Sequence, residues 1–360
     1  MIVKNEQPFL DGCLKSLQGL VDEIVIVDTG STDASVDIAR AHGARILRYA
    51  WHDDFAAARN VGLEAAGSEW ILYIDADERL VETTRDDLRV GLDAPDVYAA
   101  RLLFRVTSNS TLYREFRLFR NDKRLRFKGA MHETMLPDLS ALQRAAGVHV
   151  IDTTAKLFHL GYDGDMLAKY RRNLPLLRAS VERHPDRSYY WQDLANTLAG
   201  LDQLDEAIAV SSQGLGRREP TDRPGRIMRS MLIHTHARLR MQRGEDMREL
   251  IAAGLTFHPE NWSLLFLRAR ASVNAGAFGA AIDDLRLLLA QDADAVVDDI
   301  LAHDRRIFGA YAHDLMGVAL LRLGNRAEAA AAFARAAAAA PGVQEYRVKA
   351  MALGGAAALA

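Results

Sequence analysis

The chain of 360 residues has a single cysteine, Cys13. One cysteine excludes an intramolecular disulfide and a metal site built on several cysteines. Cys13 lies in an apolar helical pattern, which favours a small core residue over a nucleophile. A chain without disulfides fits a reducing compartment, and we expect a cytoplasmic protein.

Long apolar runs and a secretory leader are also missing. The opening MIVKNEQPFL lacks the basic start of a signal peptide, and no segment reaches the roughly 18 uncharged apolar residues of a membrane helix. The formal net charge is only −3, so the chain as a whole does not attract nucleic acid or an anionic membrane. We therefore expect no membrane insertion and no nucleic-acid partner.

The first 160 residues or so alternate short apolar strands with amphipathic helices. This order predicts an α/β domain in which helices cover both faces of an open, parallel sheet. The expected elements are strands at 23–28, 44–49 and 70–75 and helices at 31–43 and 53–67.

The rest of the chain predicts pairs of helices joined by short turns. The expected turn residues are Asp202, Gly244, Gly276 and Gly324, separated by 42, 32 and 48 positions. These pairs resemble tetratricopeptide repeats, whose period is about 34 residues. Stacked helical pairs share one core and commonly bind peptide or protein, although they can also only brace another domain or form a dimer contact.

Three acids follow the strand expected at 70–75. Asp75 and Asp77 are separated by one residue, so both carboxylates can face one side and hold a divalent cation such as Mg²⁺ or Mn²⁺. The carboxyl end of a parallel strand is where open α/β sheets bind ligands. Such a pair also occurs in surface loops that hold no ligand. Glu78 is expected only to cap or brace the turn.

Four segments resemble glycosyltransferase family 2, nucleotide-sugar enzymes of the A-type fold, in their order and spacing. They are MIVKNE, IVIVDTGSTD, AAARNVGLEAAG and YIDADE, and the resemblance covers roughly residues 1–160. It implies that Asn5, Glu6 and Asp28 hold the nucleoside, with Asp28 accepting from a base N–H or a ribose hydroxyl.

The resemblance also assigns the charged residues that come later in these segments. Arg59 is expected to reach the base or a phosphate, with a surface ion pair as the alternative. Asp77 would be the principal metal ligand, and Asp75 would share the metal or bind ribose. Related enzymes often complete the metal site with a late histidine, which here is His159 in KLFHLGY. A purely structural histidine is the alternative.

The segment GAMHE carries the candidate base. Inverting sugar transfer needs a group that deprotonates the acceptor. We expect this group to be Glu133, with His132 either as the base instead or as the residue that orients it. The commoner family pattern has two acids here, and the His-Glu pair departs from it. Most of the basic residues between 113 and 128 are expected to be solvated.

Together these patterns predict a catalytic domain at 1–162, a connecting helix at 163–186 and helical repeats at 187–360. This architecture resembles the peptide S- and O-glycosyltransferases of glycosylated bacteriocins. It implies inverting, metal-dependent transfer of a hexose or N-acetylhexosamine from a UDP sugar to a peptide or protein bound by the repeats. A homodimer is a further expectation.

Two alternatives remain at this point. One keeps the chemistry and changes the acceptor to lipopolysaccharide core or another envelope saccharide. The other is a repeat scaffold with an inactive sugar-nucleotide domain. A nucleotidyltransferase is disfavoured, because no glycine-rich, lysine-containing phosphate loop opens the first helix.

Overall fold

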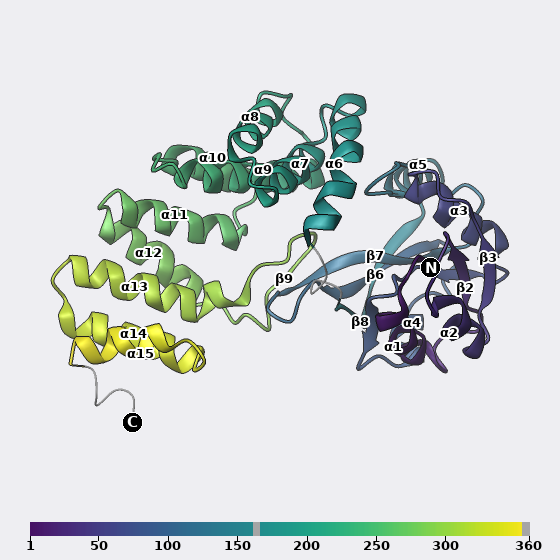
Figure 1. Cartoon of the computed structure of the whole chain (residues 1–360), viewed down its shortest axis with the longest axis horizontal. Coiled ribbons are helices and arrows are strands. Elements are labelled where there is room, and N and C mark those ends of the chain that lie inside the picture. Colours follow the sequence, from purple (N-terminus) through teal and green to yellow (C-terminus); the bar gives the residue numbers. More distant parts are fainter. Residues whose placement is uncertain (161–165, 355–360) are drawn as a thin grey trace. The chain divides into compact units, whose positions relative to one another are not determined.

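A computed structural model describes residues 1–160 and 166–354 (Figure 1). The chain divides into two compact units. The N-terminal unit comprises Met1–Ser108 and Leu112–Met166, and the helical unit comprises Asn109–Thr111 and the chain from Leu167 onward. The boundary expected at 162 lies outside the described residues.

A small parallel sheet opens the N-terminal unit. Its strands are β1 (Ile2–Val3), β2 (Val25–Asp28) and β3 (Arg45–Arg48), in that order. The helices that follow these strands are α1 (Gln7–Leu17), α2 (Ser35–Ala41) and α3 (Phe55–Ala65). The strand–helix–strand unit expected between 23 and 49 is confirmed, because β2 and β3 pair in parallel around α2.

A second, mostly antiparallel sheet completes the unit. Its strands run in the order β4-β7-β6-β8-β5, and only β6 and β8 pair in parallel. They span β4 (Trp70–Leu72), β5 (Glu78–Val81), β6 (Val97–Arg105), β7 (Leu112–Arg120) and β8 (His149–His159). Two short helices, α4 (Arg85–Arg89) and α5 (Leu136–Ala146), lie between these strands in sequence.

The α/β class predicted for this half is confirmed, but one detail is wrong. The strand expected at 70–75 ends at Leu72 and pairs antiparallel with β7, so the acids do not follow a strand of the parallel sheet. The physical reason is that β6 and β7 form a long hairpin, whose β7 edge offers β4 a complete set of backbone hydrogen-bond partners.

The core of the N-terminal unit is built around α1. Leu10, Cys13 and Leu14 are fully buried on one face of this helix, and their cluster includes Ile26 of β2 and Leu102 of β6. Burial raises the pKa of the Cys13 thiol to about 12. A thiol that stays protonated is not a nucleophile, so the interpretation of Cys13 as a core residue is confirmed.

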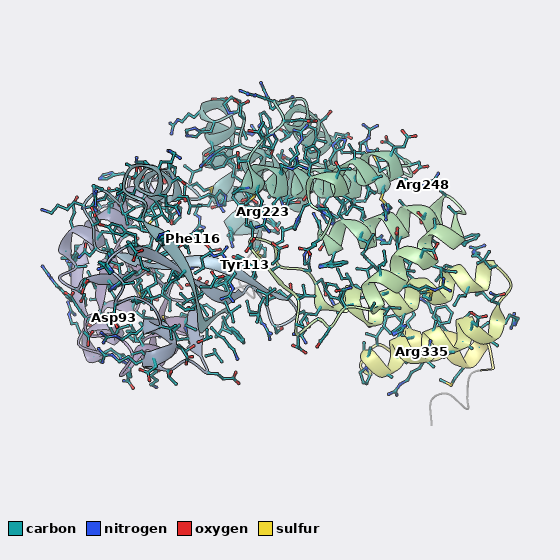
Figure 2. The ribbon with its side chains drawn as sticks, turned by 180° about the vertical axis from the view of Figure 1, so that it is seen from behind. Asp93, Tyr113, Phe116, Arg223, Arg248 and Arg335 are labelled. Atoms are coloured by element: carbon teal, nitrogen blue, oxygen red, sulfur yellow. The ribbon has the colours of Figure 1, made fainter. Side chains whose placement is uncertain are left out.

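The helical unit contains α6 (Met166–Arg183) and four helical pairs, seen with their side chains in Figure 2. The pairs are α7 (Ser188–Gly200) with α8 (Leu204–Leu215), α9 (Arg223–Met241) with α10 (Arg248–Phe257), α11 (Trp262–Asn274) with α12 (Phe278–Leu289), and α13 (Ala310–Arg322) with α14 (Arg326–Ala339). A last helix, α15, spans Gln344–Ala352. Part of the connecting helix expected at 163–186 is α6, while 163–165 lie outside the described residues.

The predicted turn residues are confirmed by their backbone conformation. Asp202, Gly244, Gly276 and Gly324 have φ values of 59°, 77°, 75° and 85°, the left-handed conformation that ends a helix. In three pairs the second helix starts two residues after the turn, whereas α10 starts four residues after Gly244. The second pair therefore has a longer turn than the other three.

The longer connection near residue 300 contains a short strand and a short 3₁₀ helix, β9 (Val297–Asp298) and η2 (Arg305–Phe308). Within the described ranges, every helix is too short or too polar to cross a bilayer.

The close approach of α13 and α14 gives a stability prediction. A Cβ at Gly317 would lie 2.6 to 2.8 Å from ring atoms of Phe333, which is buried and cannot move aside freely. We expect Gly317→Ala to lower the free energy of unfolding by about 1–3 kcal/mol through overpacking. Urea unfolding followed by circular dichroism measures this change.

The control is Gly279→Ala in α12, where nothing lies within 4 Å of the added atom. This change should be neutral or stabilising by up to about 1 kcal/mol, because alanine is the better helix former. Equal unfolding midpoints for the two variants would contradict the packing of α13 on α14.

Candidate active site

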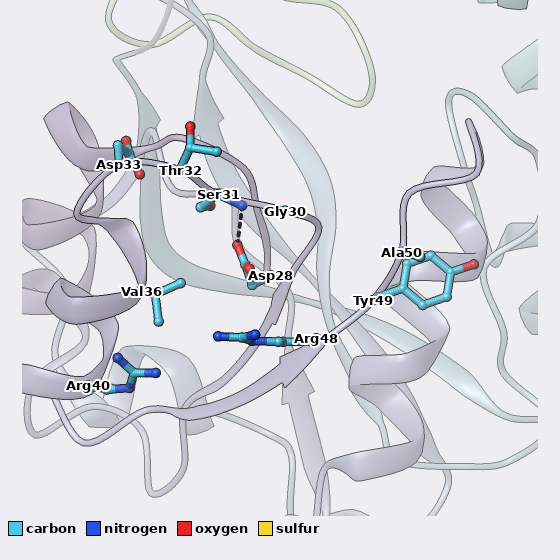
Figure 3. A pocket seen from close by; sticks show the side chains of 10 residues that line it. All are labelled: Asp28, Gly30, Ser31, Thr32, Asp33, Val36, Arg40, Arg48, Tyr49 and Ala50. Carbon is cyan, nitrogen blue, oxygen red and sulfur yellow. Dashed lines mark hydrogen bonds between the residues drawn. The ribbon is translucent and has the colours of Figure 1, made fainter.

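A polar pocket of about 450 Å³ opens at the carboxyl ends of β2 and β3 (Figure 3). Asp28 ends β2, is 6% exposed, and accepts a hydrogen bond from the backbone N–H of Ser31 (3.0 Å). The pocket is lined by Asp28, Gly30, Ser31, Thr32, Asp33, Val36, Arg40, Arg48, Tyr49 and Ala50. The structure therefore places Asp28 in a pocket at the edge where parallel sheets bind ligands.

Asn5 and Glu6 do not line this pocket but hold its loop in place. The side-chain oxygen of Asn5 accepts from the backbone N–H of Thr32 (2.7 Å), and the backbone N–H of Glu6 donates to the hydroxyl of Ser35 (2.8 Å). Asn5 has a φ of 58°, which asparagine tolerates well. Both residues thus fix the loop from Ser31 to Ser35, Asn5 through its side chain and Glu6 through its backbone.

Sequence reasoning missed the basic residues of this pocket. Arg48 lies directly beside Asp28 in the β2–β3 register, and in Figure 3 its side chain extends across the pocket toward Arg40. The signal was present, because two parallel strands of equal length end side by side. Arg48 at the end of the strand expected at 44–49 could have been paired with Asp28 on that basis.

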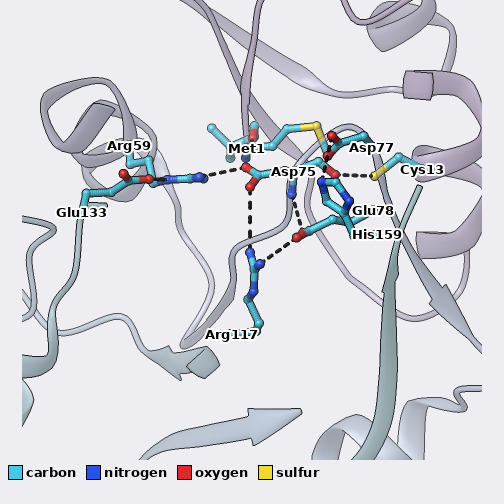
Figure 4. A network of polar contacts seen from close by, with 10 residues as sticks. Met1, Cys13, Arg59, Asp75, Asp77, Glu78, Arg117, Glu133 and His159 are labelled. Atoms are coloured by element: carbon cyan, nitrogen blue, oxygen red, sulfur yellow. Dashed lines mark hydrogen bonds and ion pairs between the residues drawn. The ribbon is translucent and has the colours of Figure 1, made fainter. Parts of the chain in front are cut away.

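A second polar cluster forms where the acidic turn meets α3 (Figure 4). The helix begins after Asp54, whose carboxylate accepts from the N–H of Ala57 (2.9 Å). Arg59 then donates through Nη2 to Asp75 (2.8 Å) and through Nε to Glu133 (2.5 Å). Its side chain is only 9% exposed, so the surface ion pair given as the alternative for Arg59 is instead a buried bridge between two carboxylates.

The residue after Arg59 explains why Glu133 reaches this position. Asn60 exchanges two hydrogen bonds of 3.0 Å with the backbone of Phe127, and Lys128 and Thr134 close the loop by pairing their backbones. The consecutive Arg59 and Asn60 of α3 therefore hold the loop that contains Glu133. His132, half-buried in the same loop, has a φ of 51°.

The charges in this cluster keep Asp75 ionised. Burial disfavours the carboxylate, but the guanidinium groups of Arg59 and Arg117 outweigh it and lower the pKa of Asp75 to about 2. Arg59 therefore occupies one oxygen of Asp75, and the Nη1 atom of Arg117 lies 4.0 Å from the other.

Glu78 braces the acidic turn, as expected. It is 1% exposed, accepts from the backbone N–H of Asp75 (2.8 Å), and accepts from Arg117 (2.6 Å). Burial raises the pKa of Glu78 to about 7, although the Arg117 guanidinium opposes the shift. Arg117 is itself buried, an exception among the basic residues of this region that were expected to be mostly solvated, and it pairs with an acid that the fold has removed from water.

Asp77 and His159 come together, and Asp75 stays apart from them. His159 pairs with Glu78 in the β5–β8 register, which brings its Nε2 atom to 3.1 Å from Oδ2 of Asp77. Two ligands of an octahedral cation at about 2.1 Å would lie about 3 Å apart. The carboxylate and the imidazole are thus at a separation that fits neighbouring ligands of one Mn²⁺ or Mg²⁺ ion.

Within the described ranges, no group of three or more His, Cys, Asp or Glu residues is arranged to hold a metal. The pair of Asp77 and His159 is still a sufficient protein contribution for such an ion. Magnesium and related ions are commonly held by one or two protein ligands together with the phosphate oxygens of a substrate.

Comparison with known proteins identifies a family that the N-terminal residues match. Residues 1–94 match the model of Glycosyl transferase family 2. A TPR repeat-containing protein of Synechococcus elongatus is 37% identical over 233 residues, which cover 62% of this chain and 58% of that protein. The SPbeta prophage-derived glycosyltransferase SunS of Bacillus subtilis is 28% identical over 219 residues, covering 58% of this chain and 50% of SunS.

The chain thus spans 58% of the length of the Synechococcus elongatus protein and 50% of the length of SunS. Among solved structures, glucosyl-3-phosphoglycerate synthase from Mycobacterium tuberculosis aligns with 50% of this chain and 76% of its own, at 14% identity and a TM-score of 0.36. Residues 1–94 thus match glycosyltransferase family 2, and the chain continues into helical pairs that resemble tetratricopeptide repeats.

Proposed function

We propose that the protein is an inverting glycosyltransferase that moves a sugar from a nucleoside diphosphate to an acceptor. The observation that carries this proposal is that Arg59 joins Asp75 to Glu133 while Asp77 faces His159, on segments that are distant in sequence. An acid pair for the donor and a separate carboxylate for the acceptor are the groups that such a reaction needs.

The nucleoside would bind in the pocket of Asp28. The Asp28 carboxylate can accept from an imide N–H or a ribose hydroxyl, which suits a uridine nucleotide. Arg48 and Arg40 add positive charge at the side of the pocket, where they can attract an anionic ligand. The donor would therefore be a UDP sugar carrying a hexose or an N-acetylhexosamine.

Asp77 and His159 would hold a Mn²⁺ or Mg²⁺ ion. When bound, such an ion neutralises charge on the diphosphate that leaves the sugar. Arg59 would also help to neutralise the diphosphate, because its Nη1 atom is buried without a hydrogen-bond partner among the described residues. A diphosphate oxygen is a suitable acceptor for that N–H group. Asp75 would bind ribose, or orient Arg59, rather than act as a principal metal ligand.

Glu133 would act as the base. In a single displacement, the acceptor nucleophile forms a bond to the anomeric carbon while the bond from that carbon to the diphosphate oxygen breaks. The acceptor proton passes to the Glu133 carboxylate, one oxygen of which is already held by Arg59. His132, the neighbouring residue in the loop, would orient Glu133 or replace it as the base.

The acceptor would be a peptide or protein. The helical pairs offer a surface of the kind that commonly binds extended peptides, and the relative SunS is a glycosyltransferase. An envelope saccharide is the second candidate acceptor. A scaffold without activity is disfavoured, because a site that no longer bound substrate would not need two buried arginines paired with Asp75, Glu78 and Glu133.

The metal assignment predicts the effect of Asp77→Asn. This change keeps the shape of the side chain but removes the charge that holds the cation. We expect Mn²⁺-dependent release of UDP from a UDP sugar to fall by about a hundredfold. EDTA should stop release by the wild-type protein, and added Mn²⁺ should restore it.

The matched control is Asp96→Asn. Asp96 also lies beside a histidine, His149, at 3.5 Å, but both side chains are exposed. UDP release should be unchanged in this variant. Turnover that persists in EDTA, or that is equal in the two variants, would eliminate the proposed metal site.

The pocket assignment predicts weaker nucleotide binding in Arg48→Ala. Loss of a charged hydrogen-bond donor should raise the dissociation constant for UDP roughly tenfold, measured by isothermal titration calorimetry. Arg45→Ala is the control, since Arg45 lies on the same strand but is exposed and bonds the carbonyl of Ala65. If both variants bind UDP like the wild type, the nucleoside does not occupy this pocket.

A further inference from the structure

The first helices of three helical pairs carry a polar residue at one fixed position. Six residues before the turn, the first three pairs have Asn196, Arg238 and Arg270, and the fourth has Val318. The turn residues all share a left-handed conformation, so this count compares equivalent sites. We call Asn196, Arg238 and Arg270 the basic row.

These three residues lie on neighbouring helices. Helix α9 packs against both α7 and α11. The residues just before the row, Ala195, Ala237 and Ala269, are fully buried, and these small side chains let the helices approach closely. Arg238 donates through Nη2 to the side-chain oxygen of Asn196 (3.1 Å), which links the row from α7 to α9.

Positive charge in the row is left without an acidic partner. In the part of the chain that the structure describes, neither Arg238 nor Arg270 forms an ion pair. Other arginines of the same helices do so, such as Arg268 with Asp284 (2.7 Å) and Arg240 with Glu245.

The positive charge of the row lowers the pKa values of groups within and beside it. Burial first, and then the charge of Arg270, lower the pKa of Arg238. Burial together with Arg238 and Arg270 also lowers the pKa of His234, one helical turn before Arg238, to about 4. The histidine is therefore neutral at physiological pH, and the Arg270 guanidinium is close enough to disfavour the charge on Arg238.

An anion that reaches both arginines would relieve this repulsion. A carboxylate matches the planar fork of a guanidinium, with two parallel hydrogen bonds. Packed helices lie about 8–10 Å apart, and a peptide in the extended polyproline II conformation advances about 3.1 Å per residue with three residues per turn. Acidic side chains three residues apart would therefore lie on one side of the peptide, about 9 Å apart, and reach neighbouring positions of the row.

The rest of the face also suits a peptide. The side-chain oxygen of Asn196 is occupied by Arg238, which leaves its NH₂ group to donate to a peptide carbonyl. Phe266, one turn before Arg270 on α11, stacks with Tyr311 of α13 (6.3 Å between ring centres). This aromatic pair offers an apolar contact next to the charged positions.

We propose that the basic row docks an acidic, extended peptide segment, with Arg238 and Arg270 holding its carboxylates. The proposal rests on the proposed function in one respect, namely that this peptide segment would be part of the acceptor. Docking itself requires neither donor nor metal, so it can be tested separately from sugar transfer.

The test measures binding of a fluorescein-labelled peptide with glutamate at every third position by fluorescence anisotropy, using the full chain. The same peptide with glutamine in place of glutamate is the reference ligand. We expect Arg238→Ala and Arg270→Ala each to weaken binding of the acidic peptide about tenfold or more. Binding should also weaken with added salt, and the glutamine peptide should bind poorly.

The control variant is Arg335→Ala, which removes an exposed arginine of α14 outside the row (Figure 2). It should bind the acidic peptide like the wild type. Because Arg238 is partly buried, a second variant changes the exposed Arg270. Arg270→Glu should no longer bind the acidic peptide and should instead prefer a peptide with lysine in place of glutamate. UDP release without acceptor should be unchanged in all these variants.

Equal binding of the acidic peptide by the wild type, Arg238→Ala and Arg270→Ala would overturn the proposal. So would a sulfated saccharide or a single-stranded oligonucleotide that binds the row more tightly than the peptide. Loss of UDP release with peptide binding intact would instead count against the proposed transferase activity alone.

Discussion

The bridge made by Arg59 between Asp75 and Glu133 is the interaction on which the candidate site depends. A guanidinium removed from water needs carboxylates beside it, and breaking a buried pair of this kind costs about 3–5 kcal/mol. The bridge connects α3, the acidic turn and the loop of Glu133, which are distant in sequence. It therefore holds together the turn of Asp75, which we propose to contact the donor, and the loop of Glu133, our proposed base.

A second buried pair, Glu78 with Arg117, supports the first. Glu78 binds the backbone of Asp75, so the turn that contains Asp75 and Asp77 has one conformation. With Asp75 turned toward Arg59, Asp77 is left to face His159. The two acids of one short motif thus acquire different partners and, in our proposal, different tasks.

The sequence predicted those features that depend on neighbouring residues. The β2–α2–β3 unit and the four left-handed turns follow from local pattern, because each needs only an apolar period, a cap or a residue that tolerates positive φ. The strand at 70–75 was placed in the wrong sheet, since its partner β7 begins forty residues later and only that hairpin supplies its hydrogen bonds. The burial of Arg117 was missed for the same reason: its acid, Glu78, is 39 residues away.

The site shows the same division between local and distant information. By itself the sequence determined the identity and spacing of the acids, the candidate base and the late histidine, because a motif is a local arrangement of residues. Only the tertiary structure decided that Arg59 would join Asp75 to Glu133, that Asp77 would meet His159, and that Asn196, Arg238 and Arg270 would form one row. Each of these relations joins side chains from different segments, and hydrogen bonding and helix packing bring such segments together only when the chain folds.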